Sequence, residues 1–481
     1  MPKSTSQPLI KDLKNTLDDR ILHPWQYLEY RGEDDRTFID KSEGIYLYDK
    51  TGKKLIDGPG GMWNVNVGHG VKEIADAVYN QITKMPYASP FTESTEIAHN
   101  YASRLVQYAP GDLKRIFFTS GGSSAVDSAL RFVMFYNNIL GRKEKKQIIS
   151  RNDAYHGSTF LGASCSGKER DKNNFDFASN IVHHISSPNP FRKPDDLTDE
   201  EFCDLKVQEL ENKIIEIGAD KVAAFIAEPI LASGGVIVPP KGYHKKTHEI
   251  CKRHDVLYIS DEIVTGFGRL GHIFASENYF DFTPDIILLA KGITSGYVPC
   301  GAVVISERLM SKLDNKEKVI FSNGFTDSGH PVSMAAATAT LDYIEKTNLL
   351  DHVKDVGPYF QAKLRELTDL PIVGEVRGEG LMAAVECVGN KDKKDPLNLS
   401  YEIGSRINEH CQQLGLIVRP LFSTCVMSPS LIITKEQIDD LVSILRKGIE
   451  LATDDIKKEG LWSATSNSVS YTHLTLPTTL L

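Results

Sequence analysis

The amino-acid sequence predicts an α/β protein in which a large domain, with a mostly parallel central sheet flanked by helices, is joined to a smaller α+β domain. Three observations support this prediction. Short apolar runs at residues 256–260 and 286–290 are rich in β-branched residues, as in the fully buried strands of parallel sheets. From residue 114 such runs alternate with stretches of helical periodicity. From about residue 347 the order changes to helix, strand, strand, helix.

Composition limits the class of protein. At 481 residues the chain exceeds a single core, and its 41% hydrophobic and 25% charged residues are typical of a soluble globular protein. The net charge of −9 argues against nucleic acid or an anionic membrane as the main partner. No apolar run has the length of a membrane span, and the N-terminus lacks the apolar core of a signal peptide. Seven cysteines without CxxC spacing indicate reduced thiols, so we expect a cytoplasmic enzyme.

The N-terminal elements can be read from their turn and periodicity signals. The first 40 residues are mostly polar and predict an entry segment with Trp25 and Tyr27 as anchors. Alternating apolar residues on either side of a polar turn predict a hairpin at residues 44–61. Apolar residues at helical spacing then predict helices at residues 71–85 and 95–108.

The rest of the chain divides into an alternating region, a C-terminal region and a tail. The expected elements are strand 115–119, helix 125–137, a strand starting at 147, a long loop 181–194, helix 200–217, strand 221–230, helix 242–254, the strands 256–260 and 286–290, helix 324–346, strands within 371–386 and 415–434, and helix 435–453. The tail is polar, rich in threonine and similar to a translated sequencing adapter. We therefore predict that residues 461–481 are disordered, and exclude them from the functional interpretation.

The two central strands each end in one charged residue, Asp261 and Lys291. The carboxyl ends of parallel strands are where open α/β sheets bind ligands. Pyridoxal phosphate (PLP) needs an amine to form a Schiff base with its aldehyde and a carboxylate to keep its ring nitrogen protonated. A lysine between Ala290 and Gly292 is partly desolvated, which favours the nucleophilic free amine. Either residue alone is more often an ordinary loop residue, so the interpretation also requires a phosphate site.

Residues 117–130 supply a candidate for that phosphate site. They read as a strand, a Gly-Gly-Ser-Ser turn and a helix, an arrangement that presents backbone N–H groups and hydroxyls where the helix dipole favours a phosphate. Gly122 lets the backbone approach a ligand closely, and Ser123 and Ser124 add hydroxyl donors. A simple helix cap, for which serine is the usual residue, explains the same pattern equally well.

Two further positions follow predicted strands. Tyr155 and His156 come after the strand that starts at residue 147, and an aromatic there can stack on a cofactor ring, although packing is its commoner role. Glu228 ends another strand, within reach of a ring substituent. Each position is compatible with a cofactor site without defining one.

Two other patterns have weaker functional interpretations. The glycines of residues 266–271 match GxGxxG, but the stretch that follows is a poor helix, which argues against a dinucleotide site. His244 and His248 are spaced like metal ligands on a helix, yet the lysines around them favour a solvated helix face over zinc. We therefore predict no metal site.

Taken together, these motifs resemble the class III PLP-dependent aminotransferases of fold type I, in the branch of ω-amino acid and amine:pyruvate transaminases. Over residues 44–453 the motifs occur in the family's order: FFTSGGSSAVDSALR, YHGST, AEPI, SDEIVTGFGRLG, LAKGITSGYVPCGAV, GFTDSGHP, VRGEGLM and GLIVRP. The resemblance implies a PLP-binding domain at residues 76–335 and a small domain built from residues 1–75 and 336–460. It also implies a homodimer with shared active sites, with a tetramer left open.

The resemblance further implies roles for individual residues. Lys291 is similar to the Schiff-base lysine that also carries a proton, and Asp261 to the partner of the ring nitrogen. The other implied cofactor contacts are Gly122 and Ser123 at the phosphate, Tyr155 with His156 and Ile263 around the ring, Glu228 near the ring hydroxyl, and Thr326 at the phosphate of the neighbouring subunit's cofactor. The implied substrate contacts are Trp63, Phe91 and Arg419, with Arg419 at the keto-acid carboxylate.

The implied activity is transfer of an amino group from an amine or ω-amino acid to a keto acid, with pyruvate expected, by a ping-pong mechanism. The sequence departs from the family pattern at Gly121, Ser124 and Asp327, where serine, glutamate and an aromatic residue are usual. Two alternatives stay open: a mutase, racemase or decarboxylase with the same cofactor, and a non-catalytic binding relative. β-Alanine, taurine, a diamine or an aryl amine would all suit as donor. We hypothesise that a mobile Arg419 pairs with a carboxylate only when the substrate carries one.

Overall fold

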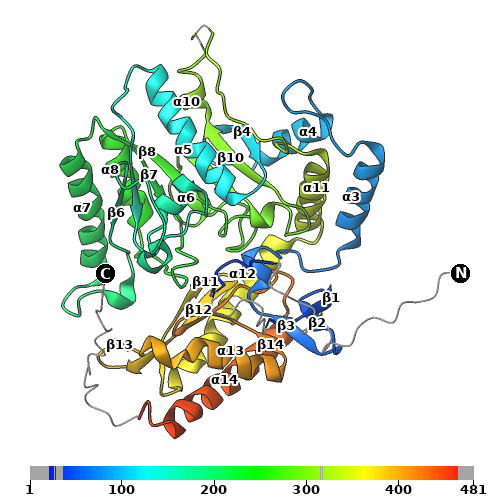
Figure 1. The fold of residues 1–481 in the computed structure, drawn as a ribbon, viewed down its shortest axis with the longest axis vertical. Coiled ribbons are helices and arrows are strands. Elements are labelled where there is room, and N and C mark those ends of the chain that lie inside the picture. Colours follow the sequence, from blue (N-terminus) through cyan, green and yellow to red (C-terminus); the bar gives the residue numbers. More distant parts are fainter. Residues whose placement is uncertain (1–20, 27, 29–35, 315, 317, 464–481) are drawn as a thin grey trace, which may run out of the picture.

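A seven-stranded sheet forms the centre of the larger part of the molecule (Figure 1). The structure, a computed structural model, describes residues 21–26, 28, 36–314, 316 and 318–463. Strand β10 is antiparallel to both of its neighbours, and the remaining strands from β9 to β6 are parallel. The order across the sheet is β4 (Leu113–Thr119), β10 (Gly301–Ser306), β9 (Ile286–Leu289), β8 (Leu257–Asp261), β7 (Val222–Ala227), β5 (Gln147–Arg151) and β6 (Val182–Ile185).

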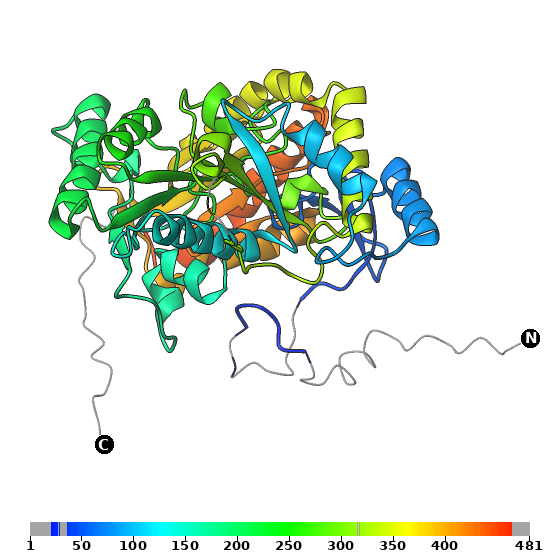
Figure 2. The same ribbon diagram turned by 90° about the horizontal axis from the view of Figure 1, so that it is seen from above.

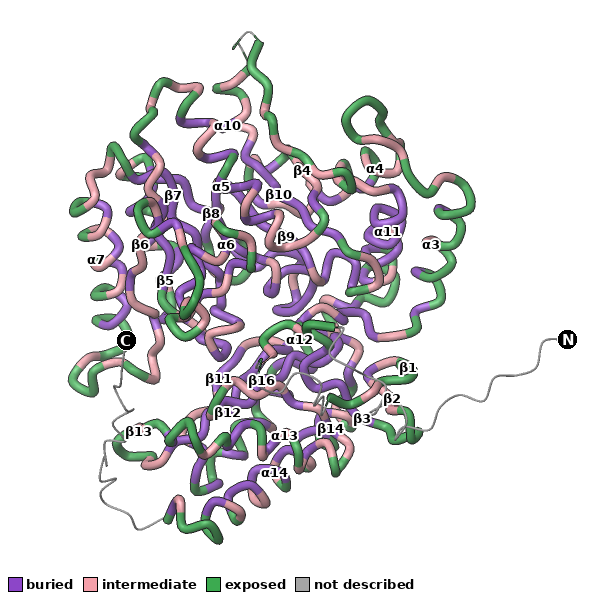
Figure 3. The backbone as a smooth tube through the Cα atoms, viewed as in Figure 1, coloured by how far each residue is buried: buried purple, intermediate pink, exposed green. Residues whose placement is uncertain are grey.

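Helices cover both faces of this sheet, as Figure 2 shows from above. On one face Val126, Leu130 and Val133 of α5 pack with strand residues in a single apolar cluster. On the other face α7 and α8 cover Phe225 and Tyr258. Because both faces are covered, every residue of β7, β8 and β9 is buried, which explains their largely apolar sequences (Figure 3). The helices of this part are α3 (Lys72–Lys84), α4 (Glu96–Leu105), α5 (Gly122–Ile139), α6 (Phe160–Cys165), α7 (Asp199–Ile217), α8 (Tyr243–Arg253), α9 (Ala275–Asn278), α10 (Glu307–Met310) and α11 (Pro331–Lys346).

The smaller part combines the two ends of the described chain. Its first sheet has the order β1-β2-β3-β14, in which β14 pairs in parallel with β3 and so joins an N-terminal hairpin to the C-terminal region. Its second sheet has the order β11-β12-β16-β15, with β13 on β12. The elements are β1 (Ile39–Glu43), β2 (Tyr46–Asp49), β3 (Lys54–Asp57), α2 (Gly60–Trp63), α12 (Leu349–Arg365), β11 (Val373–Glu379), β12 (Met382–Asn390), β13 (Asp395–Pro396), α13 (Ile403–Leu414), β14 (Leu416–Ile417), β15 (Arg419–Leu421), β16 (Thr424–Met427) and α14 (Lys435–Lys458). This arrangement confirms the predicted α/β fold class, while the predicted domain boundaries stay predictions.

Two strands of the large sheet were not predicted. The segment predicted as a loop from residue 181 contains β6, an edge strand in which Val182 and Ile185 are buried while the two histidines between them are half-buried. A polar centre on an edge strand hides the usual apolar pattern. Strand β10 was missed because it runs antiparallel between β4 and β9 and therefore breaks the strand–helix alternation.

Three element boundaries were also wrong. The alanine-rich helix begins at Pro331 rather than at residue 324, because proline occupies the first turn and His330 caps it. No strand covers residues 430–434 in the described part of the chain, and α14 extends to Lys458. Trp462 is buried and donates a hydrogen bond to the Gly389 carbonyl at 2.9 Å, so this residue packs against the fold although the predicted tail starts at residue 461. Residues 464–481 lie outside the described residues.

Other predictions concern the surface and the thiols. Within the described ranges, no helix combines the length and the apolar character of a membrane span. All seven cysteines are buried and free. Trp25 is mostly exposed, with its ring centroid 6.1 Å from that of Tyr155, and Tyr27 lies outside the described residues.

Candidate active site

A pocket of about 210 Å³ lies at the carboxyl ends of the central parallel strands. Glu228 follows β7, Asp261 ends β8 and Lys291 lies just after β9, so three neighbouring strands bring these side chains to one place. The pocket is lined by Met62, Gly122, Ser123, Tyr155, His156, Gly157, Glu228, Ala232, Ser233, Asp261, Ile263, Val264, Ala290 and Lys291. The structure therefore brings together eight of the residues that the sequence singled out: Gly122, Ser123, Tyr155, His156, Glu228, Asp261, Ile263 and Lys291.

Lys291 occupies a strained and buried position. Its φ of 47° is in the left-handed region, which costs a non-glycine residue about 1–3 kcal/mol and persists only where the surroundings impose it. The next residue must be Gly292, because a Cβ there would lie 2.5 Å from Asn66 Nδ2. Within the described chain, the Lys291 amine makes no hydrogen bond or ion pair. Burial lowers the pKa of Lys291 to about 8, against the opposing effects of Asp261 and Glu228, and so increases the free-amine fraction near neutral pH.

Asp261 is held by two hydrogen bonds. Its Oδ2 lies 2.7 Å from Nδ1 of His156, and its Oδ1 accepts the backbone N–H of Ile263 at 3.2 Å. Both side chains of the Asp261–His156 pair are buried. The other ring nitrogen of His156, Nε2, has no partner among the described residues. His156 therefore orients the carboxylate, a role that its place in the sequence beside Tyr155 did not reveal.

Glu228 uses both carboxylate oxygens for main-chain contacts. Oε1 accepts the N–H of Tyr155 and Oε2 that of Ala232, each at 3.0 Å. Burial raises the pKa of Glu228, and the negative charge of Asp261 adds to this effect. The glutamate thus fixes two loops that line the pocket, and in particular the position of Tyr155.

Two interlocking loops form a cradle at the N-terminus of α5. Ser123 Oγ accepts the backbone N–H of Ser158 at 3.1 Å, and a Cβ at Gly157 would lie 2.6 Å from the same Oγ. A Cβ at Gly122 would lie 3.0 Å from Ile263 Cδ1. Ser124 instead donates its hydroxyl to the Gly121 carbonyl at 2.8 Å. The cradle therefore depends on glycines that leave its floor open and on the free N–H groups of the first helical turn.

The predicted substrate residues lie around the pocket rather than in its wall. Trp63 is buried behind Ala232 and Val264, and its neighbour Met62 lines the pocket instead. The Arg419 guanidinium contacts the Met62 sulfur and lies 5.8 Å from the Trp63 ring centroid. Burial lowers the pKa of Arg419. The predicted substrate contacts of Trp63 and Arg419 stay predictions.

Phe91 and Thr326 lie outside this pocket, on neighbouring exposed segments. A Cβ at Gly324 would lie 3.4 Å from the Phe91 ring, and the hydroxyl of Tyr87 donates to the Thr326 carbonyl at 3.0 Å. Their predicted roles also stay predictions.

The two weaker motifs have structural roles. Arg269, inside the GxGxxG stretch, is buried and donates hydrogen bonds to the carbonyls of Leu381 and Pro429 and to Asn66 Oδ1, so this loop fastens the large sheet to the smaller part. The next helix, α9, has four residues, so this loop does not lead into the long helix of a dinucleotide site. The prediction of a solvated face was wrong for His244, which is buried because α8 packs that face onto the sheet; its ring nitrogens lie 2.8 Å from the Tyr258 hydroxyl and the Pro229 carbonyl.

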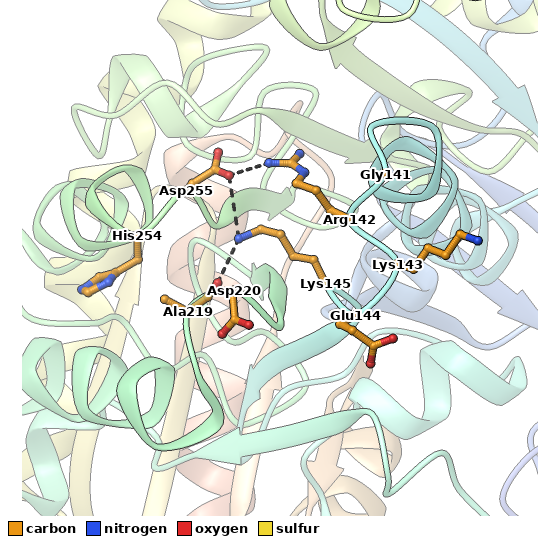
Figure 4. A pocket seen from close by; sticks show the side chains of 9 residues that line it. All are labelled: Gly141, Arg142, Lys143, Glu144, Lys145, Ala219, Asp220, His254 and Asp255. Carbon is orange, nitrogen blue, oxygen red and sulfur yellow. Dashed lines mark hydrogen bonds and ion pairs between the residues drawn. The ribbon is translucent and has the colours of Figure 1, made fainter.

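A second hollow lies at the amino ends of strands of the large sheet. Figure 4 shows the residues that line it. Its residues precede β5, β7 and β8, whereas the pocket residues follow them. Arg142 pairs with Asp255 at 2.6 Å, and Lys145 lies 3.8 Å from the same carboxylate while donating to the Ala219 carbonyl at 2.9 Å. These central charges satisfy one another, so the hollow is not a candidate site.

The fold and the pocket define a class of protein. A mostly parallel sheet that presents a lysine and an aspartate at adjacent strand ends, beside a helix N-terminus, is the arrangement of the fold type I PLP-dependent transferases. The chain belongs to the class III aminotransferases: residues 30–449 match the family described as "Aminotransferase class-III". The protein is therefore an aminotransferase, and its family consists of PLP enzymes that use an amine donor and a keto-acid acceptor.

Named relatives agree with this assignment. The chain is 38% identical over 437 residues to the putrescine–pyruvate aminotransferase of Pseudomonas aeruginosa. The aligned region covers 90% of this chain and 94% of that protein. It superposes on an (S)-enantioselective ω-transaminase from Thermomicrobium roseum with a TM-score of 0.87, at 35% identity, over 93% of this chain and 98% of that one. It superposes on the ω-transaminase from Pseudomonas jessenii in complex with PMP with a TM-score of 0.89, at 32% identity, over 94% and 99% of the two chains.

Proposed function

We propose that the protein holds PLP covalently at Lys291 and transfers the amino group of a primary amine or ω-amino acid to pyruvate. One observation carries the proposal: the Lys291 amine and the Asp261 carboxylate, from the ends of adjacent parallel strands, line the same pocket. The names of the relatives, which include a putrescine–pyruvate aminotransferase, support an amine donor and pyruvate as acceptor.

The residues of the pocket fit PLP. Lys291 offers an amine without a partner in the described chain, and Asp261 a buried carboxylate for the ring nitrogen. Tyr155 and Ile263 supply aromatic and apolar surface for the ring, and the cradle of Gly122 and Ser123 supplies N–H donors for the phosphate. When bound, PLP supplies an electron sink that stabilises negative charge on the carbon bearing the amino group.

The protein's own groups then perform the proton transfers. With PLP bound, Lys291 Nζ would be the base that takes the proton from the donor carbon and later returns a proton on the acceptor side. The Asp261 carboxylate keeps the ring nitrogen protonated, and the hydrogen bond of 2.7 Å from His156 keeps that carboxylate in place. Glu228 holds the loop of Tyr155 against the pocket.

Arg419 is suited to the carboxylate of the keto acid. It contacts only the weakly accepting Met62 sulfur and the Trp63 ring, and has no carboxylate partner within the described chain. Met62 lines the pocket and is 53% exposed, so a different conformation of this side chain would leave space for the guanidinium to reach the pocket. The variant Arg419→Ala tests this role. We expect it to lose the half-reaction with pyruvate and to keep the half-reaction with an amine donor.

We also propose a homodimer with shared active sites. Phe91 is 69% exposed and packs beside Gly324 on the loop that carries Thr326. A large exposed aromatic beside such a loop is typical of a contact surface. In a dimer this surface would place Thr326 near the phosphate, and Phe91 near the substrate, of the other subunit. Light scattering tests the proposal: a mass corresponding to one 53.5 kDa chain would exclude it.

The direct test of the function uses the absorption spectrum of the purified protein. We expect a yellow protein that loses its colour when an amine such as putrescine is added without a keto acid, and regains it with pyruvate. The cycle reports both half-reactions separately. A yellow protein that keeps its colour with every amine would contradict amino transfer, and a protein that stays colourless with added PLP would contradict the role of Lys291.

The pH dependence of cofactor capture provides a further prediction. Because only the free amine attacks the aldehyde and burial lowers the pKa of Lys291 to about 8, the capture rate of the apoprotein should rise about tenfold per pH unit below pH 8 and level off above it. The measurement is the growth of absorbance after mixing apoprotein with PLP, normalised to a model amine at each pH. A rate that still rises beyond pH 10 would show an ordinary lysine pKa.

A further inference from the structure

A second and larger pocket, of about 690 Å³, lies beside the first. Ser233 lines both pockets, so the second continues the active site toward the junction of the large sheet with the smaller part of the molecule. One wall comes from loops of the larger part, including residues 167–170, and the other from the smaller part, including residues 421–424. A substrate longer than the first pocket therefore has room to extend here.

Most charges on this second pocket are already paired. Arg192 and Arg377 both form ion pairs with Glu386, and Arg170 pairs with Asp171 at 3.1 Å. The guanidinium of Arg170 also lies 3.9 Å from the centre of the Phe422 ring. Lys168 is different, because in the described part of the chain its amine makes no hydrogen bond and no ion pair.

The Lys168 amine lies at the boundary between the two pockets. It is 5.8 Å from the centroid of the Tyr155 ring, which lines the first pocket, while Lys168 itself lines the second. Burial lowers the pKa of Lys168 to about 8. The negative charges of Asp171 and Glu228 oppose this effect, and the positive charges of Arg170 and Arg419 add to it. The amine is therefore mostly protonated at neutral pH. Lys168 is half-buried, and its amine faces the Tyr155 ring, so it is available to form an ion pair with a ligand that carries a carboxylate.

We propose that Lys168 is a specificity-determining residue that binds the carboxylate at the far end of an ω-amino acid donor. The proposal rests on the proposed function and names the donor class of the same site. The amino end of the donor reaches Lys291 in the first pocket, its methylene chain passes Tyr155, and its carboxylate pairs with Lys168. A neutral amine lacks this contact. The far ammonium of a diamine is repelled by Lys168, and Asp153, one of the carboxylates that line the second pocket, would attract it instead.

Three donors of equal chain length test the proposal: 6-aminohexanoate, hexylamine and 1,6-diaminohexane, each with pyruvate. In Lys168→Met, which keeps the side-chain length, kcat/KM for 6-aminohexanoate should fall roughly 10-fold to 100-fold, as for a lost charge-assisted hydrogen bond. Hexylamine should stay within about twofold and 1,6-diaminohexane should improve. Lys172→Met, on the same segment but outside both pockets, is the matched control. Equal losses for all three donors, or a loss confined to the diamine, would overturn the proposal.

A binding measurement separates this proposal from the proposed function. Hexanoate carries the far carboxylate but no amine, so its calorimetric titration into the holoprotein needs no turnover. We expect Lys168→Met and Lys168→Gln to weaken hexanoate binding at least about tenfold, with 1-hexanol unaffected. If no amine is turned over but the hexanoate difference is seen, the proposed function fails, and Lys168 stands only as a residue that binds a carboxylate. Equal affinity of wild type and both folded variants for hexanoate would refute the role of Lys168.

Discussion

Replacing Lys291 with alanine is expected to lower the rate of amino transfer by at least about 10⁴-fold, because both the covalent attachment and the proton transfer depend on its amine. The variant should still fold. Its apoprotein should have a melting temperature equal to or above that of the wild-type apoprotein. The reason is that burial lowers the pKa of Lys291, so the native state holds an ammonium in an unfavourable place at neutral pH, and alanine removes it. Activity and stability should therefore change in opposite directions.

Two measurements establish this result. Borohydride reduction followed by mass spectrometry should leave the cofactor attached to the wild type and not to Lys291→Ala. Lys252→Ala, at an exposed position on α8, is the control and should behave as the wild type in every assay. A variant at position 291 that keeps a few per cent of the activity would show that another group carries the proton.

The central sheet could be predicted because its strands are buried on both faces. Residues of β7, β8 and β9 need apolar side chains at nearly every position, and that requirement is visible in the sequence. Strand β6 is at the edge, where two half-buried histidines are tolerated, and β10 runs against the alternation. The polar centre of β6 hides the apolar pattern, whereas β10 is buried at every residue but follows β9 without an intervening α-helix, so both strands were missed.

The same distinction applies to the site. Lys291 and Asp261 follow apolar strands, so the sequence predicts that both lie at the carboxyl ends of the parallel strands. Met62 lines the pocket only because the chain kinks before it, with a φ of 64° at Gly61, and Lys168 lies in irregular structure between two pockets. Such positions depend on loops whose conformation is set by distant partners. His156 was identified, but its bond to Asp261 became visible only in three dimensions.

Replacing Asp261 with asparagine should lower kcat about 10³-fold while leaving the protein yellow. Asparagine has nearly the same shape, and its oxygen can still accept one of the two existing hydrogen bonds, from His156 or from Ile263. It lacks the negative charge that keeps the ring nitrogen protonated, so the electron sink weakens although Lys291 still attaches the cofactor. Colour and turnover therefore separate in this variant, whereas both are lost in Lys291→Ala.

The cause of the loss in Asp261→Asn can be tested by supplying the missing charge. A PLP analogue methylated at the ring nitrogen carries a permanent positive charge, so it should restore part of the activity of Asp261→Asn and should not restore that of Lys291→Ala. Asp255→Asn is the control for removing a carboxylate and should leave kcat unchanged. Asp255 pairs with Arg142 in the hollow at the amino ends of the strands, away from the active site. If the analogue gives no recovery, the carboxylate acts on the shape of the pocket through His156 and not through the charge of the ring.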